Sequence, residues 1–405
     1  MSERFDTGSA AQLPQGWRMS TVGRCCAIKN SLRFPLSAAS RSSMSGEYPY
    51  FGPTGQLDSI DHYRIDEPFA LIGEDGDHFL KFRDRPMTIY FEGKANVNNH
   101  AHIVGDSDEC LAKWFFYSFM HRDLTPALSR QGVGRYKLTK AGLEKLQIPL
   151  PPKPEQAAIV EVLSTWDRAI ATKERLLENA KQHFESLRRQ LLIKPALVGE
   201  WETRTIGAIS ERVQRRANEG EVLPVLMISS GSGFVRQDEK YSRFMAGKSV
   251  ENYIALERGE FAYNKGNSKI YEFGCVFALG GYERGLVPNV YVCFKLLPNL
   301  NAAFYEHLFR ADYLHDQLGA LVNTGVRNNG LLNIRPADFL ACQVPVPPMD
   351  VQSQIAEALT SVARWVELQE HDLHLLKQEK AALMPQLLTG KRRVKLFDAE
   401  TEALA

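Results

Sequence analysis

Apolar residues recur at heptad spacing through two long stretches of the chain. Alternate steps of four and three residues from 159 to 191 land on apolar side chains, with one polar interruption at Lys173. The same steps from 355 to 387 give a second apolar series, in which Gln369 and Lys380 are polar. A seam this narrow and sustained is typical of helices that pack against helices. The spacing predicts two long helices, and antiparallel pairing would bring Lys173 and Gln369 together.

A constant offset of 196 residues relates these two stretches and the proline runs that precede them. PLPP at 149–152 falls on PVPP at 345–348, and Gln156 falls on Gln352. Prolines hold the entering chain extended and are tolerated in the first helical turn but not in the interior. Each copy is therefore predicted to be one helix opened by prolines, and the repeat indicates two similar units.

The segments before the helices repeat as well. Short β-rich runs such as PFALIG and MTIYFEG, broken by glycine and asparagine turns, predict a small sheet. WFFYSFMHRDL and FYEHLFRADYL predict one apolar-faced helix in each unit, and Pro195 is expected to end the first long helix. At an offset of 184 residues the matched positions are Trp17 and Trp201, Thr21 and Thr205, and Gly23 and Gly207.

These patterns predict an α+β protein. Two similar mixed α/β domains would be joined by two long antiparallel coiled-coil helices with a pseudo-two-fold axis. Roughly 37 helical residues would span about 55 Å. An ordinary helical arm for dimerisation is the alternative explanation of the heptads. The expected ranges are 1–150 for the first domain, 151–194 for the first helix, 195–345 for the second domain, 346–390 for the second helix and 391–405 for a C-terminal tail.

The composition of the chain excludes some classes of protein but does not indicate a function. The 405 residues carry a net charge of +1, so any nucleic-acid surface must be local. We expect a cytoplasmic protein without a membrane segment, because the opening MSERFDTGSAAQ lacks an apolar core and no apolar run approaches a membrane span. The six cysteines form no CxxC and no metal-ligand spacing, which favours reduced thiols and no metal site.

Two loop-like stretches, 41–66 and 212–248, differ between the units but are both rich in Arg, Lys, Ser and Tyr. These residue types contact phosphates and base edges, although most such loops are merely solvated. Segments that are alike in the two units are interpreted as structural. Segments that differ are expected to recognise different targets. The expected groove or backbone contacts are Arg41, Ser43, Tyr50, Arg215, Arg216 and Lys265.

A glycine loop precedes each proline run. SRQGVGRYKL at 129–138 and NTGVRNNGLLNI at 323–334 match Gly134 with Gly330 at the offset of 196. Glycine lets a backbone approach a phosphate closely, and neighbouring cations and amides supply donors. An exposed glycine turn is the plainer alternative. The expected DNA-contacting residues are Arg135, Lys137, Arg327, Asn328 and Asn329.

Catalytic motifs do not stand out in the chain. There is no GxxxxGK[ST] loop and no Asn/Asp-Pro-Pro-aromatic tetrapeptide. The acidic run GEDGD at 73–77 favours a tight turn over a cation site, and His100 and His102 favour hydrogen bonding on one strand face over metal ligation. We therefore expect no catalytic residues and no cofactor in this chain.

Taken together, the chain resembles the specificity subunits of type I restriction-modification systems over nearly its full length. The resemblance rests on the two proline runs with PEQ at 154–156 and VQ at 351–352, on YPYFGPTG, ALIGEDG and GKANVNNHAHIV, and on the glycine loops. The second unit departs from the pattern, with PMDVQSQ in place of the PEQ segment and GGYERGLVPNVYV in place of GKANVNNHAHIV.

The resemblance implies a function without chemistry of its own. In that family each globular unit is a target recognition domain that reads half of a split sequence in double-stranded DNA, and the paired helices set the unread gap. Two modification subunits, which methylate adenine using S-adenosylmethionine, and ATP-dependent restriction subunits are the implied partners. Two unlike domains would read an asymmetric target.

Two other classes remain open from the residues. A coiled-coil scaffold that binds only protein would share the heptads but would not need basic glycine loops in both units. A stand-alone nuclease or methyltransferase would need metal-dependent cutting or S-adenosylmethionine binding by this chain alone.

Overall fold

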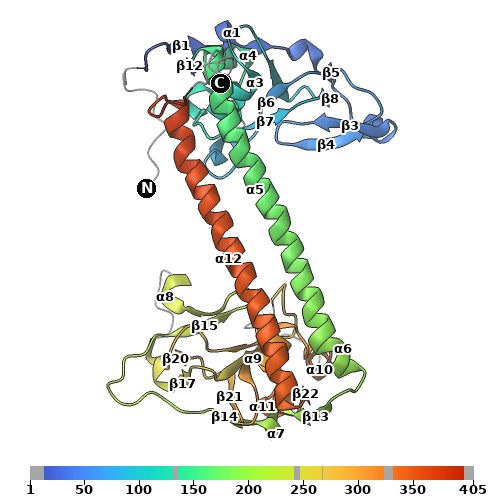
Figure 1. The fold of residues 1–405 in the computed structure, drawn as a ribbon, viewed down its shortest axis with the longest axis vertical. Coiled ribbons are helices and arrows are strands. Elements are labelled where there is room, and N and C mark those ends of the chain that lie inside the picture. The colour runs from blue at the N-terminus through green and yellow to red at the C-terminus, as the bar shows by residue number, and fades with distance from the viewer. Residues whose placement is uncertain (1–12, 131–135, 241–246, 267, 323–331, 396–405) are drawn as a thin grey trace, which may run out of the picture. The chain divides into compact units, whose positions relative to one another are not determined.

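The chain divides into two compact units. In the computed structural model, unit 1 comprises Met1–Lys173 and Asp372–Ala405, and unit 2 comprises Glu174–His371. The structure describes residues 13–130, 136–240, 247–266, 268–322 and 332–395 (Figure 1). Both unit boundaries fall within the long helices, so each unit holds one globular part and a segment of each helix. The domain ranges expected from the sequence stay predictions.

In each unit a strand near the start of the globular part pairs antiparallel with the strand that precedes the long helix. In unit 1, β1 (Arg18–Thr21) pairs with β12 (Gln147–Leu150), the first residue of one strand facing the last of the other. In unit 2, β13 (Glu202–Thr205) pairs with β22 (Gln343–Val346) in the same register. These strands are related by the two sequence offsets, 184 residues for the first and 196 for the second. The internal repeat therefore holds at the level of strand register.

The central sheet of unit 1 is antiparallel, with the strand order β2-β9-β6-β7. Its two middle strands are buried at every residue, which explains their continuous apolar sequences. The helix α3 (Ala112–Phe119) packs on β6 and β7 with its aromatic face. The strands are β2 (Ala27–Ile28), β6 (Phe69–Gly73), β7 (Thr88–Phe91) and β9 (Ala101–Gly105).

A second sheet of unit 1 has the order β4-β3-β8-β5. Strands β3 and β4 form a hairpin, and β3 also runs parallel to β8. Figure 1 shows this sheet beside the central one. The strands are β3 (Ser45–Phe51), β4 (Gln56–Ile60), β5 (Ile65–Asp66) and β8 (Lys94–Val97), and the further elements of unit 1 are α1 (Val22–Cys25), η1 (Asn30–Leu32), α2 (Ala38–Ser42), η2 (His78–Lys81), η3 (Thr125–Ala127), β10 (Ser129–Arg130), β11 (Tyr136–Lys137) and α4 (Lys140–Lys145).

Unit 2 repeats this topology. Its central sheet has the order β14-β21-β18-β19, strand for strand the order seen in unit 1, and α9 (Ala302–Arg310) packs on β19. The hairpin β15-β16 and the pair β17-β20 take the places of β3-β4 and β5-β8, but they form two separate two-stranded sheets connected by one parallel bridge between Val225 and Leu286. The remaining elements are β14 (Ser210–Arg212), β15 (Leu226–Ser229), β16 (Gly233–Arg236), β17 (Ile254–Glu257), β18 (Phe261–Asn264), β19 (Cys275–Ala278), β20 (Arg284–Val287), β21 (Val292–Leu296), α7 (Ile206–Ile209), α8 (Gln237–Lys240), η5 (Gly247–Asn252), α10 (His315–Leu321) and α11 (Pro336–Leu340).

The proline runs are bound by buried aromatic residues of the packed helices. Trp114 on α3 donates its Nε1 hydrogen to the carbonyl oxygen of Pro149 at 3.0 Å. Tyr305 on α9 donates its hydroxyl hydrogen to the carbonyl oxygen of Pro345 at 3.1 Å. Both rings are fully buried, so their single polar groups need these partners. The same proline carbonyl thus anchors the core of each unit.

A buried glutamine then joins each long helix to its unit. The Gln156 side chain accepts a hydrogen bond from Leu111 N at 3.0 Å and donates to the carbonyl oxygens of Glu109 and Pro151. In unit 2, Gln352 accepts from Asn301 N at 2.9 Å and donates to the carbonyl oxygen of Pro347 at 2.8 Å. The loop before the packed helix is thereby tied to the first turn of the long helix.

The long helices are α5 (Lys153–Arg188) and α12 (Met349–Leu388). Every position of the two heptad seams is buried or half-buried, which confirms the predicted seam. Within unit 1 the helices run antiparallel, since Lys173 bonds Asp372 at 3.2 Å while Asp167, nearer the start of α5, bonds Lys380 further along α12. Gln369 belongs to unit 2, and its meeting with Lys173 stays a prediction.

Unit 2 shows the same antiparallel pairing. Lys181 of α5 forms an ion pair with Glu370 of α12, and Phe184 packs in the core cluster that also contains Leu359 and Ile355. Apolar seam residues thus stabilise the pairing, while exposed ion pairs at its edges contribute little energy but favour one register.

The expected end of the first helix at Pro195 is wrong. After α5 the backbone continues through a π turn, η4 (Arg189–Ile193), into α6 (Lys194–Leu197). Proline lacks an N–H and crowds the preceding turn of an α-helix, but Pro195 stands in the first turn of α6, where that hydrogen is not needed. None of the helices in the described part of the chain is both long and apolar enough to cross a bilayer.

The C-terminal segment of unit 1 folds back onto the start of α5. Gly390 adopts a φ of +72° against Pro14, where a Cβ atom would collide with the proline ring. Arg393 then binds the carboxylate of Glu155, which is 2% exposed and also accepts a hydrogen bond from Trp17 Nε1 at 2.9 Å. This carboxylate connects the N-terminal segment, the helix α5 and the C-terminal segment.

Substituting Gln156 with Ala should destabilise unit 1. The change leaves Leu111 N and two carbonyl groups without their buried partner, and each such group costs about 1 to 3 kcal/mol. We expect a loss of several °C in Tm, measured by thermal denaturation. Gln182→Ala makes the same chemical change at an exposed site of α5 and should alter the Tm by less than about 1 °C. Equal effects of the two variants would contradict the anchoring role.

Candidate nucleic-acid interface

The glycine loop of unit 1 joins β10 to β11 beside the turn that follows β6. Residues 131–135 of the loop, including the candidate Arg135, lie outside the described part of the chain. On the described side, Leu138 N donates to Glu74 O at 2.7 Å and Gly76 N donates to Tyr136 O at 3.1 Å. The strand that follows the loop therefore runs along the GEDGD turn, and the two motifs form one surface region.

Glu74 is the charged centre of this region. Its carboxylate binds Arg33 at 2.9 Å and Lys137 at 3.1 Å, and all three side chains are mostly buried. Burial alone would raise the pKa of Glu74, but the hydrogen bond from Lys137 and the charge of Arg33 outweigh it and hold the pKa below its ordinary value. The candidate Lys137 is thus oriented by an anion, and two cations share one carboxylate.

His102 contacts one of the two cations, Arg33. It is buried, and its Nδ1 lies 2.8 Å from Arg33 Nη2 and 2.9 Å from Asn30 Nδ2, while Nε2 lies 2.7 Å from Leu138 O. Because both neighbours of Nδ1 are donors, Nδ1 accepts and Nε2 carries the hydrogen. Burial lowers the pKa of His102, which keeps the ring neutral beside Arg33. The hydrogen-bonding role predicted for this strand agrees with these contacts.

A histidine and an aspartate form a second polar pair at the exposed border of this region. His100 Nδ1 lies 3.1 Å from both carboxylate oxygens of Asp75, at an exposed site. The GEDGD turn, the HAHIV strand and residues 136–138, far apart in sequence, therefore meet at one end of the central sheet. Arg33 was missed in the sequence, because nothing in its neighbourhood indicates that it reaches this edge.

Unit 2 places different chemistry at the matching position. Residues 323–331, which include the candidates Arg327, Asn328 and Asn329, lie outside the described part of the chain. Directly after them, Leu332, which matches Tyr136 at the offset of 196, donates its backbone hydrogen to the carbonyl oxygen of Lys265 at 3.1 Å. The segment after the glycine loop thus contacts the end of the central strand in this unit as well. Lys265 follows β18 as Glu74 follows β6. A cation thus stands in unit 2 where an anion stands in unit 1.

Tyr50 is a structural residue, which corrects its expected role as a DNA contact. Its side chain is fully buried, and its hydroxyl donates to Phe34 O at 2.6 Å while accepting from Leu36 N at 3.0 Å. Arg41 stacks on this ring with 5.2 Å to its centroid and bonds Asp58. Arg41 therefore stabilises the β3-β4 hairpin, and we no longer propose Tyr50 as a surface contact.

The other loop candidates differ in how firmly they are held. Ser43 is exposed and donates its hydroxyl hydrogen to Ser40 O at 2.8 Å. Arg215 bonds the buried carboxylate of Glu260 at 2.7 Å, which fixes its direction, whereas Arg216 is exposed. Arg216 is consequently the better placed of the two arginines for a phosphate or base contact.

A further cationic and aromatic group on the second sheet of unit 1 was missed in the sequence. Lys94 lies over the ring of Tyr63 at 4.7 Å, and that ring contacts Tyr48 edge to face at 5.0 Å. Arg64 lies over Phe34 at 4.0 Å and is exposed, as is Lys94. Exposed cations with aromatic neighbours suit a nucleic-acid backbone. Only the folded sheet brings these residues together.

The two units share the strand order of their central sheet and present different charged residues at the same end of it. Residues 14–182 match the family model of the type I restriction modification DNA specificity domain. Over nearly its full length the chain is also similar to type I restriction-modification specificity subunits.

Several known proteins are similar to this chain. A putative type I restriction enzyme specificity subunit of Haemophilus influenzae is 32% identical over 136 residues, which is 34% of this chain and 34% of that relative. The MjaVIII specificity subunit of Methanocaldococcus jannaschii is 22% identical over 436 aligned positions, 97% of each chain. The crystal structure of the type I S subunit from M. genitalium covers 93% of this chain and 96% of its own at a TM-score of 0.59 and 14% identity, a likeness of fold.

Substituting Lys137 with Gln should weaken DNA binding and flatten its dependence on salt. If Lys137 neutralises one phosphate, the slope of log K against log salt should fall by about 0.9. Fluorescence anisotropy with labelled duplex DNA over a salt series measures both. Lys181→Gln removes an equal charge from α5 and serves as the matched control. A parental slope for Lys137→Gln would remove this residue from the interface.

Replacing Glu74 with Gln should lower stability in a pH-dependent manner. A carboxyl with a lowered pKa stabilises the fold fully above its ordinary pKa, and that contribution is lost as the pH falls through the lowered value. The Tm of Glu74→Gln should therefore lie below that of the parent at neutral pH and converge with it at acid pH. Exposed Glu357→Gln is the control. A gap that does not change with pH would contradict the charged network.

Proposed function

We propose that this chain reads a bipartite, asymmetric target in double-stranded DNA, one half with each unit. The observation that carries this proposal is the difference between Glu74 and Lys265 at matched positions of one repeated fold. Readers with the same backbone and different polar groups discriminate different base edges or phosphates. The proposed contacts are Arg135, Lys137, Arg327, Asn328, Asn329, Ser43, Arg216 and Lys265, with Arg41 and Arg215 as supports.

The unread gap between the half-sites would be set by the paired helices. Both α5 and α12 are continuous through the boundary between the units, and their apolar seams hold the pairing in each unit. A helix of 36 residues is about 54 Å long, which exceeds the roughly 34 Å between sites one DNA turn apart. We propose a spacer ruler on this basis.

Recruitment of two modification subunits and of restriction subunits is the second part of the proposal. Large apolar side chains stand exposed on the long helices, which supports a role for these helices as partner surfaces. Leu368 is 53% and Trp365 is 49% exposed on α12, and Leu176 is 54% exposed on α5. The chain would supply recognition, and the bound subunits would supply methylation of adenine and cleavage.

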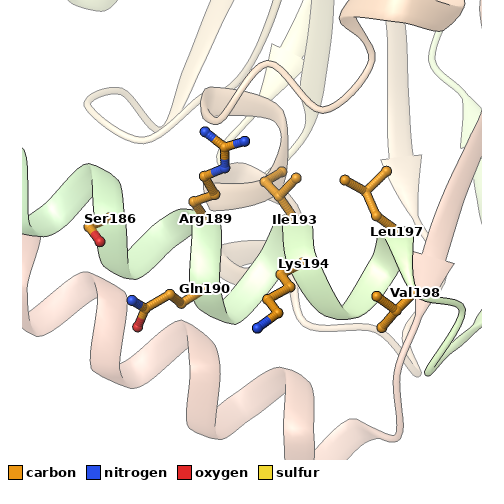
Figure 2. A pocket seen from close by; sticks show the side chains of 7 residues that line it. All are labelled: Ser186, Arg189, Gln190, Ile193, Lys194, Leu197 and Val198. Atoms are coloured by element: carbon orange, nitrogen blue, oxygen red, sulfur yellow. The ribbon is translucent and has the colours of Figure 1, made fainter.

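A pocket at the end of the first long helix could form part of such a partner surface. Figure 2 shows a pocket of about 440 Å³ in unit 2 with Arg189 and Gln190 on the π turn and Leu197 and Val198 beyond it. Leu197 is 75% exposed, so it is available to a partner. We propose that a modification subunit contacts this end of the helix.

Inserting seven residues in register into both long helices should widen the spacer. The helices would lengthen by about 10.5 Å, which corresponds to about three base pairs of B-DNA. Methylome sequencing of cells that express the variant with its modification partner would report both half-sites and the gap. The half-sites should be unchanged, because neither recognition unit is altered.

A control variant carries seven extra residues after Glu219, in an exposed connection of unit 2, and should keep the parental gap. A parental gap in the helix variant would exclude the ruler. Absence of any methylated motif dependent on this chain would exclude DNA recognition and favour a protein scaffold.

A further inference from the structure

Three cysteines of unit 1 meet in a cluster that the DNA-reading function does not use. Cys25 ends α1, Cys26 follows it, and Cys110 comes shortly before α3. Their sulfur atoms all lie within 4.8 Å of one another, and Cys25 Sγ lies 3.8 Å from Cys26 Sγ. The three residues are 2%, 9% and 1% exposed. All are free thiols, so the cluster is a preassembled set of soft ligands.

The spacing suits one shared metal ion. Zinc binds thiolate sulfur at about 2.3 Å, so two thiolates on one tetrahedral zinc stand about 3.8 Å apart. Cys25 and Cys26 already stand at that separation, and Cys110 needs only a small side-chain movement. Adjacent cysteines can reach the same ion here because Cys26 leaves the helix in an extended conformation, with φ of −111° and ψ of 149°.

The backbone around the thiols is held before any ion binds. The Ser107 hydroxyl donates to Cys25 O at 2.5 Å and accepts from Cys110 N at 2.9 Å. One side chain therefore fixes the two segments that carry the cysteines. Preorganised ligands lose little conformational entropy on binding, which favours affinity.

The internal repeat shows that the fold does not require thiols at this place. The helix α7 of unit 2 corresponds to α1, and its equivalents of Cys25 and Cys26 are Ile209 and Ser210. The residue before the N-cap of α9, the equivalent of Cys110, is Leu300. Ile209 and Leu300 pack in the core of unit 2. Apolar packing alone would thus be served by isoleucine and leucine, so three thiols indicate a separate role.

We propose that Cys25, Cys26 and Cys110 bind one thiophilic d¹⁰ metal ion, Zn²⁺ or Cu⁺, as a structural site. Thiolate ligands select these ions over hard cations such as Mg²⁺. The ion would join the end of α1 to the loop before α3, the same loop that Gln156 ties to α5. It would therefore strengthen the connection between the recognition sheet of unit 1 and the long helix.

The test is the metal content of the full chain, purified without a polyhistidine tag. Mass spectrometry of the metals should find about one Zn or Cu ion per chain. After removal of the ion, Zn²⁺ should raise the Tm by mass action, and Cd²⁺ should produce the ultraviolet charge-transfer band of cadmium thiolate. The identity of the recovered metal distinguishes Zn²⁺ from Cu⁺.

The matched variant copies unit 2 into unit 1 as Cys25→Ile, Cys26→Ser and Cys110→Leu. It should bind less than about a tenth of an ion per chain and lose the Tm response to Zn²⁺. Cys110→Ser is the smaller change and should weaken binding even if the triple variant folds poorly. Cys342→Ser, a buried thiol of unit 2, should retain the ion.

The proposal is overturned if the parental chain holds no ion either as purified or after addition of Zn²⁺. It is equally overturned if the triple variant or Cys110→Ser keeps the parental metal content and Tm response. DNA binding is measured separately, so failure of the metal site leaves the recognition function untouched.

Discussion

The structure depends on how each long helix is attached to its globular part. A proline run leads from the closing strand into the helix, its first carbonyl is bound by a buried aromatic residue, and a buried glutamine holds the preceding loop. These polar contacts are inside the core, where an unmatched group is costly. The helix direction is consequently fixed relative to the sheet of its own unit, which a spacer helix requires.

The proposed recognition edge combines a backbone shared by both units with side chains that differ between them. In both units the residue that follows a buried central strand accepts a backbone hydrogen bond from the segment after the glycine loop. Backbone contacts of this kind tolerate any side chain, so the residue at that point is free to differ. Glu74 stands at this point in one unit and Lys265 in the other, so the fold accepts either side chain there.

Much of the fold was predictable because repeats and periodicity are local in sequence. The heptad seam, the apolar helices α3 and α9 and the strands β6 and β7 follow the predicted patterns. The helix end at Pro195 was not, because a π turn places that proline in a new first turn. The burial of Tyr50 was also missed, since a tyrosine in a polar loop carries no sign of which way it points.

The sequence by itself determined that there are two copies of one unit, two long helices with apolar seams, and a resemblance to DNA specificity subunits. Tertiary structure decided which distant residues share a surface. Arg33, Glu74 and Lys137 form one ion network, and Cys25, Cys26 and Cys110 form one thiol cluster, although more than 80 residues separate parts of each group. The periodicity of apolar residues indicates which face of a helix or strand is buried. Contacts between distant residues depend instead on strand order and on the paths of the loops, which cannot be read from a short stretch of sequence.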